Sequence, residues 1–226
     1  MSDLSVGLIA AGLLPIVYNL IPNPLWVRWY WRNRDAPMPT VLAQRVQRVE
    51  LGIPFVALCL VAVSVGILLN RSEIRISSYV HLESARAVVR GIVAGLVWLA
   101  LYALLLLPVR SAELFTGRWE LRVGWGYWLA LSAPAAAIEE GWRAVCLFGI
   151  QQVGPGLAIA ITSTAFGLAH GLPPLRAISM AVFSIYACWL FLAFGSLGLT
   201  VVAHFVFNVG IFAIMRAHAA QPPRSA

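Results

Sequence analysis

The stretch Ala133–Arg143, A-P-A-A-A-I-E-E-G-W-R, places two adjacent carboxylates and an arginine inside a long apolar run. Apolar runs of this length on both sides are typical of helices buried in lipid. A charged residue at the centre of a bilayer costs about 2.5–3.5 kcal/mol on insertion scales. Such residues persist when they face a protein interior or a wet cavity and act there. The sequence therefore predicts a functional site that includes Glu139, Glu140 and Arg143.

The composition around this stretch predicts an integral membrane protein. Of the 226 residues, 61% are hydrophobic and 11% are charged, whereas soluble domains carry about 25% charged residues. The net charge of +7 comes from arginines, which membrane proteins use in their loops for orientation and for contact with anionic lipid. We therefore expect membrane lipid, and not nucleic acid, as a partner. The composition does not define an oligomeric state.

Seven apolar runs approach the roughly 20 residues that a helix needs to cross a bilayer core. We predict an all-α, polytopic membrane bundle of about seven (six to eight) transmembrane helices. Residues 1–226 then form a single membrane domain. The predicted spans are roughly 5–22, 52–69, 88–108, 124–149, 154–172, 176–194 and 196–215.

Residues 1–122 form the N-terminal spans, with an interfacial segment at 23–51 between the first two. The start of this segment, P-L-W-V-R-W-Y-W-R, interleaves Trp and Arg as interfacial anchors do. The part after Pro39 has helical apolar spacing and is predicted to lie on the membrane surface. Gly91-x-x-x-Gly95 has a spacing that permits close helix packing, but in an apolar, Gly-rich chain we attribute it to chance.

Pro134 predicts a kink or a restart of the helix ahead of the two acids, because proline lacks a backbone donor. A helix that restarts near Ala135 offers unpaired N–H groups that suit carboxylates. Glu139 and Arg143 are i,i+4 and share a face, whereas Glu140 is i,i+3 from Arg143 and also within reach. The alternative interpretation is a buried ion pair that only fixes packing.

Two histidines on later apolar runs are candidate partners of these acids. His170 ends the sequence F-G-L-A-H, just before the helix-breaking G-L-P-P, and a lone His at a helix end is usually interfacial. His204 lies well inside its run, with Asn208 four residues later on the same face. The Asn208 amide can fix the imidazole tautomer, or both side chains can bind one substrate oxygen. Polar contact between helices is the alternative.

Taken in order, E-E-x-x-R, F-x-x-x-H and H-x-x-x-N resemble the three motifs of the CAAX-processing and bacteriocin-processing intramembrane endopeptidases. This CPBP or Abi family includes the Ras-converting CAAX protease. The resemblance covers residues 133–208, the predicted catalytic core. The first motif departs from the family's E-E-x-x-x-R by one residue. Alignment on the acids makes Glu139 the first, catalytic acid; alignment on Arg143 puts Ile138 in that place and makes Glu139 the second.

The resemblance implies an endopeptidase that cuts near the membrane in a membrane-associated, lipidated or exported protein. By analogy, a glutamate takes a proton from the attacking water while His and Asn stabilise the oxyanion. We favour Glu139 as this base, and Arg143 as the partner that orients a carboxylate. The implied catalytic residues are Glu139, Glu140, His170, His204 and Asn208.

The resemblance also bears on cofactors, partners and location. We expect no cofactor; zinc held by His170, His204 and Glu139 is the alternative, but there is no H-E-x-x-H and Asn is a poor zinc ligand. The expected partner is a protein or peptide substrate, and the expected location is the bacterial cell (inner) membrane, as a multi-pass protein. Two other functions stay open: a catalytically silent member that binds a membrane partner, and a proton-coupled transporter, against which the missing internal repeat counts.

Overall fold

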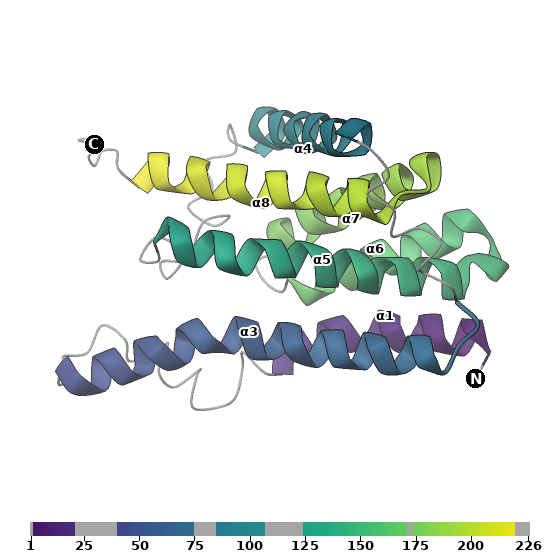
Figure 1. Ribbon diagram of the computed structural model, residues 1–226, viewed down its shortest axis with the longest axis horizontal. Coiled ribbons are helices and arrows are strands. Elements are labelled where there is room, and N and C mark those ends of the chain that lie inside the picture. Colours follow the sequence, from purple (N-terminus) through teal and green to yellow (C-terminus); the bar gives the residue numbers. More distant parts are fainter. Residues whose placement is uncertain (1, 21–39, 75–84, 107–123, 171–173, 220–226) are drawn as a thin grey trace. The chain divides into compact units, whose positions relative to one another are not determined.

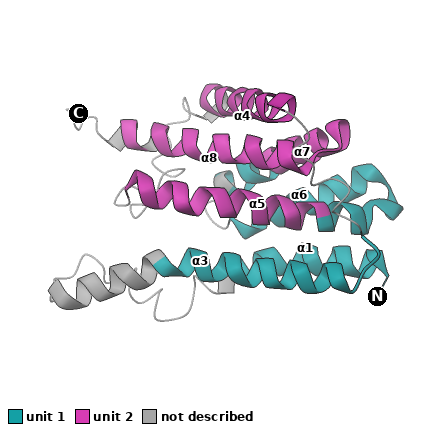
Figure 2. Ribbon diagram, in the orientation of Figure 1, with its two compact units in different colours: residues 1–74, 145–182 teal, residues 75–144, 183–226 magenta. Residues whose placement is uncertain are grey.

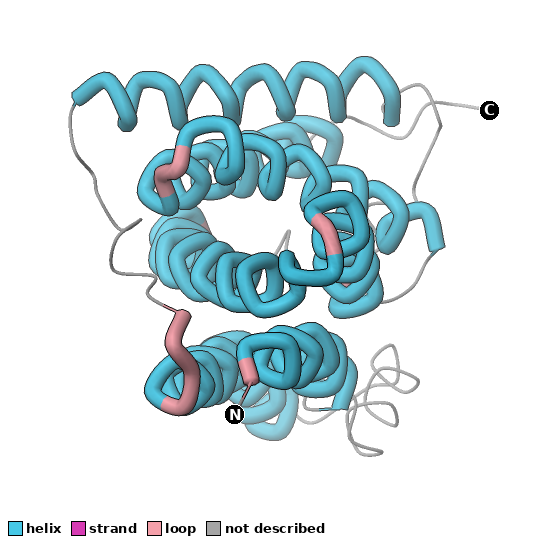
Figure 3. The backbone as a smooth tube through the Cα atoms, turned by 90° about the vertical axis from the view of Figure 1, so that its right-hand side faces the viewer, coloured by secondary structure: helices cyan, strands magenta, loops and turns pink. Residues whose placement is uncertain are grey.

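All regular structure in the described part of the chain is helical (Figures 1 and 3). The computed structural model describes residues 2–20, 40–74, 85–106, 124–170 and 174–219. Their α-helices are α1 (Asp3–Leu20), α3 (Thr40–Asn70), α4 (Ala85–Leu106), α5 (Trp125–Ile150), α6 (Pro155–Ala169), α7 (Pro174–Phe194) and α8 (Leu197–Ala219). The predicted all-α bundle of about seven helices is confirmed.

Four of these helices contain a stretch that is long and apolar enough to cross a membrane. α1 and α6 are apolar but shorter. Large apolar side chains point outward along the long helices; Val63 is 60% exposed and Leu104 is 72% exposed. Soluble proteins rarely expose large apolar patches, and these exposed side chains together with the four long apolar stretches indicate an integral membrane protein. The four stretches are Gly52–Asn70, Ala85–Leu104, Ala177–Phe194 and Leu197–Ile214.

The predicted surface segment and the span after it form one helix. α3 runs without a break from Thr40 to Asn70 and includes Pro54, and the part of it that is long and apolar enough to cross a membrane, Gly52–Asn70, agrees with the predicted span 52–69. Gly52 and Pro54 both lie inside this helix, where a glycine costs about 1 kcal/mol and a proline about 3 kcal/mol relative to alanine. The first part of the interfacial segment, residues 23–39, lies outside the described residues.

The chain divides into two compact units (Figure 2). The first comprises residues 1–74 and 145–182 and contains α1, α3 and α6. In this unit α1 packs against α6 and α3. Gly7 also meets Gly149 near the end of α5, where a Cβ added to Gly149 would lie 2.6 Å from the Gly7 backbone. The small residues let these two helices touch backbone to backbone.

The second unit comprises residues 75–144 and 183–226, and within it α4 crosses α8 at a steep angle (Figures 1 and 3). Gly91 and Gly95 lie at this crossing. An added Cβ would come within 2.8 Å of the Val202 Cβ at Gly91 and within 2.6 Å of the Ala203 carbonyl oxygen at Gly95. Real Cβ atoms do not approach so closely. The attribution of this glycine pair to chance is therefore wrong, because it makes the close approach of α4 to α8 possible.

We expect Gly95→Ala to destabilise the protein by about 1–3 kcal/mol, because the new methyl group overpacks the crossing. Gly66→Ala in α3 is the matched control, since nothing lies within 4 Å of a Cβ added there. Thermal unfolding in detergent micelles measures both variants. Equal stability of the two variants would contradict the role assigned to the glycine pair.

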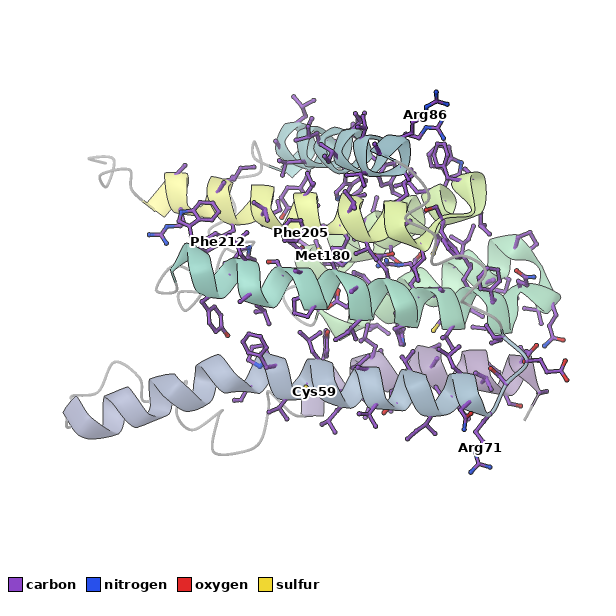
Figure 4. The ribbon with its side chains drawn as sticks, in the orientation of Figure 1. Cys59, Arg71, Arg86, Met180, Phe205 and Phe212 are labelled. Carbon is purple, nitrogen blue, oxygen red and sulfur yellow. The ribbon has the colours of Figure 1, made fainter. Side chains whose placement is uncertain are left out.

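Aromatic packing sets the register of α5 against α8 in the same unit. The Trp128 indole Nε1–H donates to the Asn208 carbonyl oxygen at 3.1 Å. Its ring stacks on fully buried Phe212, labelled in Figure 4, with centroids 4.7 Å apart. Trp125 meets Phe212 edge to face at 4.8 Å. These contacts hold the helix that carries the acids beside the helix that carries His204.

Candidate active site

The two acids and the arginine lie in the interior of an unbroken helix. α5 runs from Trp125 to Ile150 through Pro134, so the predicted restart near Ala135 is wrong. A proline removes one intrahelical hydrogen bond, and helices packed among other helices tolerate this because neighbouring groups satisfy the freed carbonyl. The carboxylates are therefore remote from the N–H groups of a helix N-terminus, and side chains must balance their charge.

Arg143 forms an ion pair with Glu140 inside the second unit. Both side chains are 2% exposed, and Glu139 is 6% exposed. Of the i,i+3 and i,i+4 pairings that this motif allows, the structure shows the first, because the arginine reaches back three residues to the second acid. A buried charge is tolerated when it is paired and hydrogen-bonded. The pair leaves Glu140 engaged as a carboxylate.

His204 of α8 meets both acids. Its Nδ1 lies 2.7 Å from the Glu140 Oε1, and its Nε2 lies 3.6 Å from the Glu139 Oε2. A carboxylate can only accept, so the imidazole Nδ1–H donates to Glu140. Glu140, and not Asn208, makes the described contact at this ring nitrogen; the alternative that His204 and Asn208 bind one substrate oxygen stays a prediction. The hydrogen bond turns the second ring nitrogen toward the side on which Glu139 lies.

Asn208 lies one helical turn after His204 on α8 and is partly buried. Its backbone carbonyl accepts the hydrogen bond of the Trp128 indole. Among the described residues, no hydrogen bond of its side-chain amide is found. The predicted shared face of His204 and Asn208 follows from their i,i+4 spacing in a continuous helix.

His170 belongs to the first unit. It caps the C-terminal end of α6, as its place before G-L-P-P predicts. Its Nδ1 lies 2.8 Å from the Phe166 carbonyl oxygen, which can only accept, so Nδ1 carries the proton. The ring packs against Phe166 at 4.5 Å and edge to face with Tyr18 of α1 at 6.3 Å. The structure thus brings Glu139, Glu140, Arg143 and His204 together in one unit and describes His170 within the other.

The part of the chain that the structure describes holds no group of three His, Cys, Asp or Glu side chains placed to bind a metal ion. Both histidines nevertheless donate from Nδ1 to an oxygen, to the Phe166 carbonyl for His170 and to Glu140 for His204. Such a hydrogen bond orients an imidazole for proton transfer as well as for metal ligation. This geometry suits both proton transfer and metal ligation, and an experiment with a chelator distinguishes them.

Two residues of α7 contact the site although sequence reasoning placed none there. Ser184 accepts a hydrogen bond from the Arg143 Nε at 3.0 Å. The Phe183 ring lies under the Arg143 guanidinium at 5.7 Å and edge to face with the His204 imidazole at 4.9 Å. The sequence marks Ser184 only as a hydroxyl inside an apolar span, and the prediction for residues 176–194 is limited to a transmembrane helix.

Comparison with known families agrees with the motif order. Residues 120–210 match the Rce1-like family, described as type II CAAX prenyl endopeptidase Rce1-like. This segment begins ahead of α5, ends within α8, and contains all three motifs. The predicted resemblance to the CPBP or CAAX protease family is confirmed over this segment. No match to the chain was found among curated proteins or among solved structures.

Proposed function

We propose that the chain is an intramembrane endopeptidase in which Glu139 activates the water that attacks a peptide bond. The observation that supports this most is the meeting of Glu139 and Glu140 with His204 in a buried cluster. Two acids, an imidazole and an arginine are costly inside an apolar bundle. Because they lie within the Rce1-like segment, we attribute their retention at this cost to catalysis.

The two acids have different roles in this proposal. Glu140 is occupied by Arg143 and by the His204 Nδ1–H, so it serves as the positioning acid. Glu139 takes a proton from water, and the resulting hydroxide attacks the scissile carbonyl carbon. The same proton then passes to the amide nitrogen as the C–N bond breaks. One carboxylate and one amine leave.

The oxyanion of the tetrahedral intermediate needs hydrogen-bond donors. We assign this role to the His204 Nε2 and the Asn208 amide, one turn apart on α8. Because the His204 Nδ1–H already donates to Glu140, donation from Nε2 requires the doubly protonated ring. Glu139 and Glu140 together balance the charges of that ring and of Arg143. His170 is assigned to the site on its F-x-x-x-H motif.

The proposed substrate is a membrane-associated protein with a peptide bond near the bilayer surface. The description of the matched family as CAAX prenyl endopeptidases supports a lipidated C-terminus; an exported protein or a bacteriocin leader is the alternative. Comparing membrane proteomes with and without the chain would reveal the substrate as a protein with an unprocessed terminus.

We expect the purified protein to cleave a quenched fluorescent peptide that carries a farnesylated CAAX sequence. Glu139→Ala should abolish cleavage, and excess 1,10-phenanthroline should leave it unchanged within about twofold, since a water activated by a carboxylate needs no metal. Loss of activity to the chelator with recovery on added zinc would instead support a metalloprotease using His170, His204 and Glu139. Absence of cleavage across lipidated and unlipidated peptides would favour the catalytically silent protein.

A further inference from the structure

We infer that Ser184 is a positioning residue of this site, which acts through Arg143 on the Glu140–His204 pair. The inference deepens the proposed function and rests on it for its kinetic consequences. It concerns α7, a helix in which none of the three family-like motifs lies. The hydroxyl of Ser184 is the second hydrogen-bonding partner of an arginine whose other defined partner is a site carboxylate.

A continuous chain of polar contacts links Ser184 to His204. The Arg143 Nε–H donates to the Ser184 Oγ at 3.0 Å, and the same guanidinium pairs with Glu140. Glu140 in turn accepts from the His204 Nδ1–H at 2.7 Å. Every member is buried; Ser184 is 0% exposed, so water does not compete for these hydrogen bonds.

The planarity of the guanidinium explains why a contact at Nε matters at Glu140. Its donors form a rigid fork, so fixing one of them fixes the direction of the others. The Phe183 ring supports one face of this plane at 5.7 Å, and the Ser184 hydroxyl sets its rotation within the plane. With both in place, Arg143 holds Glu140 where that carboxylate can hold the imidazole.

The role of the Ser184 hydroxyl can be tested without disturbing the packing around it. Phe183 stacks on Phe207 at 4.8 Å and tilts against Trp98 at 5.6 Å, so replacing Phe183 would disturb the core of the unit. Ser184→Ala removes a single oxygen and leaves these rings in place. Thr200→Val is the matched control: the Thr200 hydroxyl is equally buried and donates to the Leu197 carbonyl at 2.9 Å, a bond within α8 itself.

We expect Ser184→Ala to lower kcat about tenfold, the usual scale for one hydrogen bond to a charged group, with KM unchanged within about twofold. Thr200→Val should leave both constants near those of the wild type. The effect of Ser184→Ala should nearly vanish in an Arg143→Lys background, because lysine has no Nε–H of a guanidinium to orient. An equal loss in both backgrounds would overturn the inference, because Ser184 would then act independently of Arg143.

A second measurement does not depend on activity. In protein labelled with ¹⁵N-histidine, the ring shifts of His204, assigned by comparison with His204→Gln, report the protonation and hydrogen bonding of each ring nitrogen. Ser184→Ala should move or broaden these signals, and Thr200→Val should not. A spectral change without peptidase activity would retain the inference and refute the proposed function. Unchanged spectra and unchanged kcat in Ser184→Ala would refute the inference alone.

Discussion

Glu139→Gln should lower kcat for peptide cleavage by about 10³-fold, within the range that a general base contributes. The amide keeps the size of the side chain but cannot accept a proton from water. Glu139 is the acid that faces the His204 Nε2, at 3.6 Å, the nitrogen assigned to the oxyanion. The proposed base and the proposed oxyanion donor thus lie side by side.

Glu140→Gln is the matched comparison, measured at saturating substrate. Glu140 is the acid that Arg143 and the His204 Nδ1 hold, so its neutralisation leaves a buried arginine without its ion pair. Breaking a buried pair costs about 3–5 kcal/mol, and we expect lower yield and lower thermal stability with partial activity in the folded fraction. If Glu140→Gln instead removes turnover and Glu139→Gln keeps it, the base is Glu140 and the alignment on Arg143 is the better guide.

His204→Ala should lower kcat by about 10²–10³-fold, the effect of removing one oxyanion donor, while the protein stays in the membrane fraction. The loss has two sources, because His204 is also the hydrogen-bonding partner of Glu140. His170→Ala should lower kcat to a similar degree, as the F-x-x-x-H motif implies. Either variant that retains more than about a tenth of wild-type activity would show that its histidine is structural, since a transition-state donor contributes more.

The helices of this protein were largely predictable because lipid imposes a simple length requirement on apolar runs. The prediction fails at Pro134, a local breaker. The helix does not restart after this proline, since surrounding packing outweighs a local penalty of a few kcal/mol. Local sequence also does not reveal which helices pack together. The need for a residue without a Cβ at position 95 follows only from the close approach of α8.

The candidate site was predictable in its membership but not in its pairing. Charges in an apolar run mark Glu139, Glu140 and Arg143, yet i,i+3 and i,i+4 are equally accessible on one helix. In the structure Arg143 pairs with Glu140 and also donates a hydrogen bond to Ser184 of α7, which lies 41 residues from Arg143 in the chain. The short E-E-x-x-R spacing also becomes intelligible, because the arginine needs to reach only the second acid.

The close crossing of α4 and α8 means that the Rce1-like segment is not a transplantable module. The match covers residues 120–210, but Gly91 and Gly95 of α4, which lie outside it, approach α8 closely between Leu199 and Val206. The Trp98 ring, also from α4, packs on Phe183 and Phe207. A chain cut to the matched segment would therefore lose the helix on which Phe183 and Phe207 pack, because the match begins inside the second compact unit.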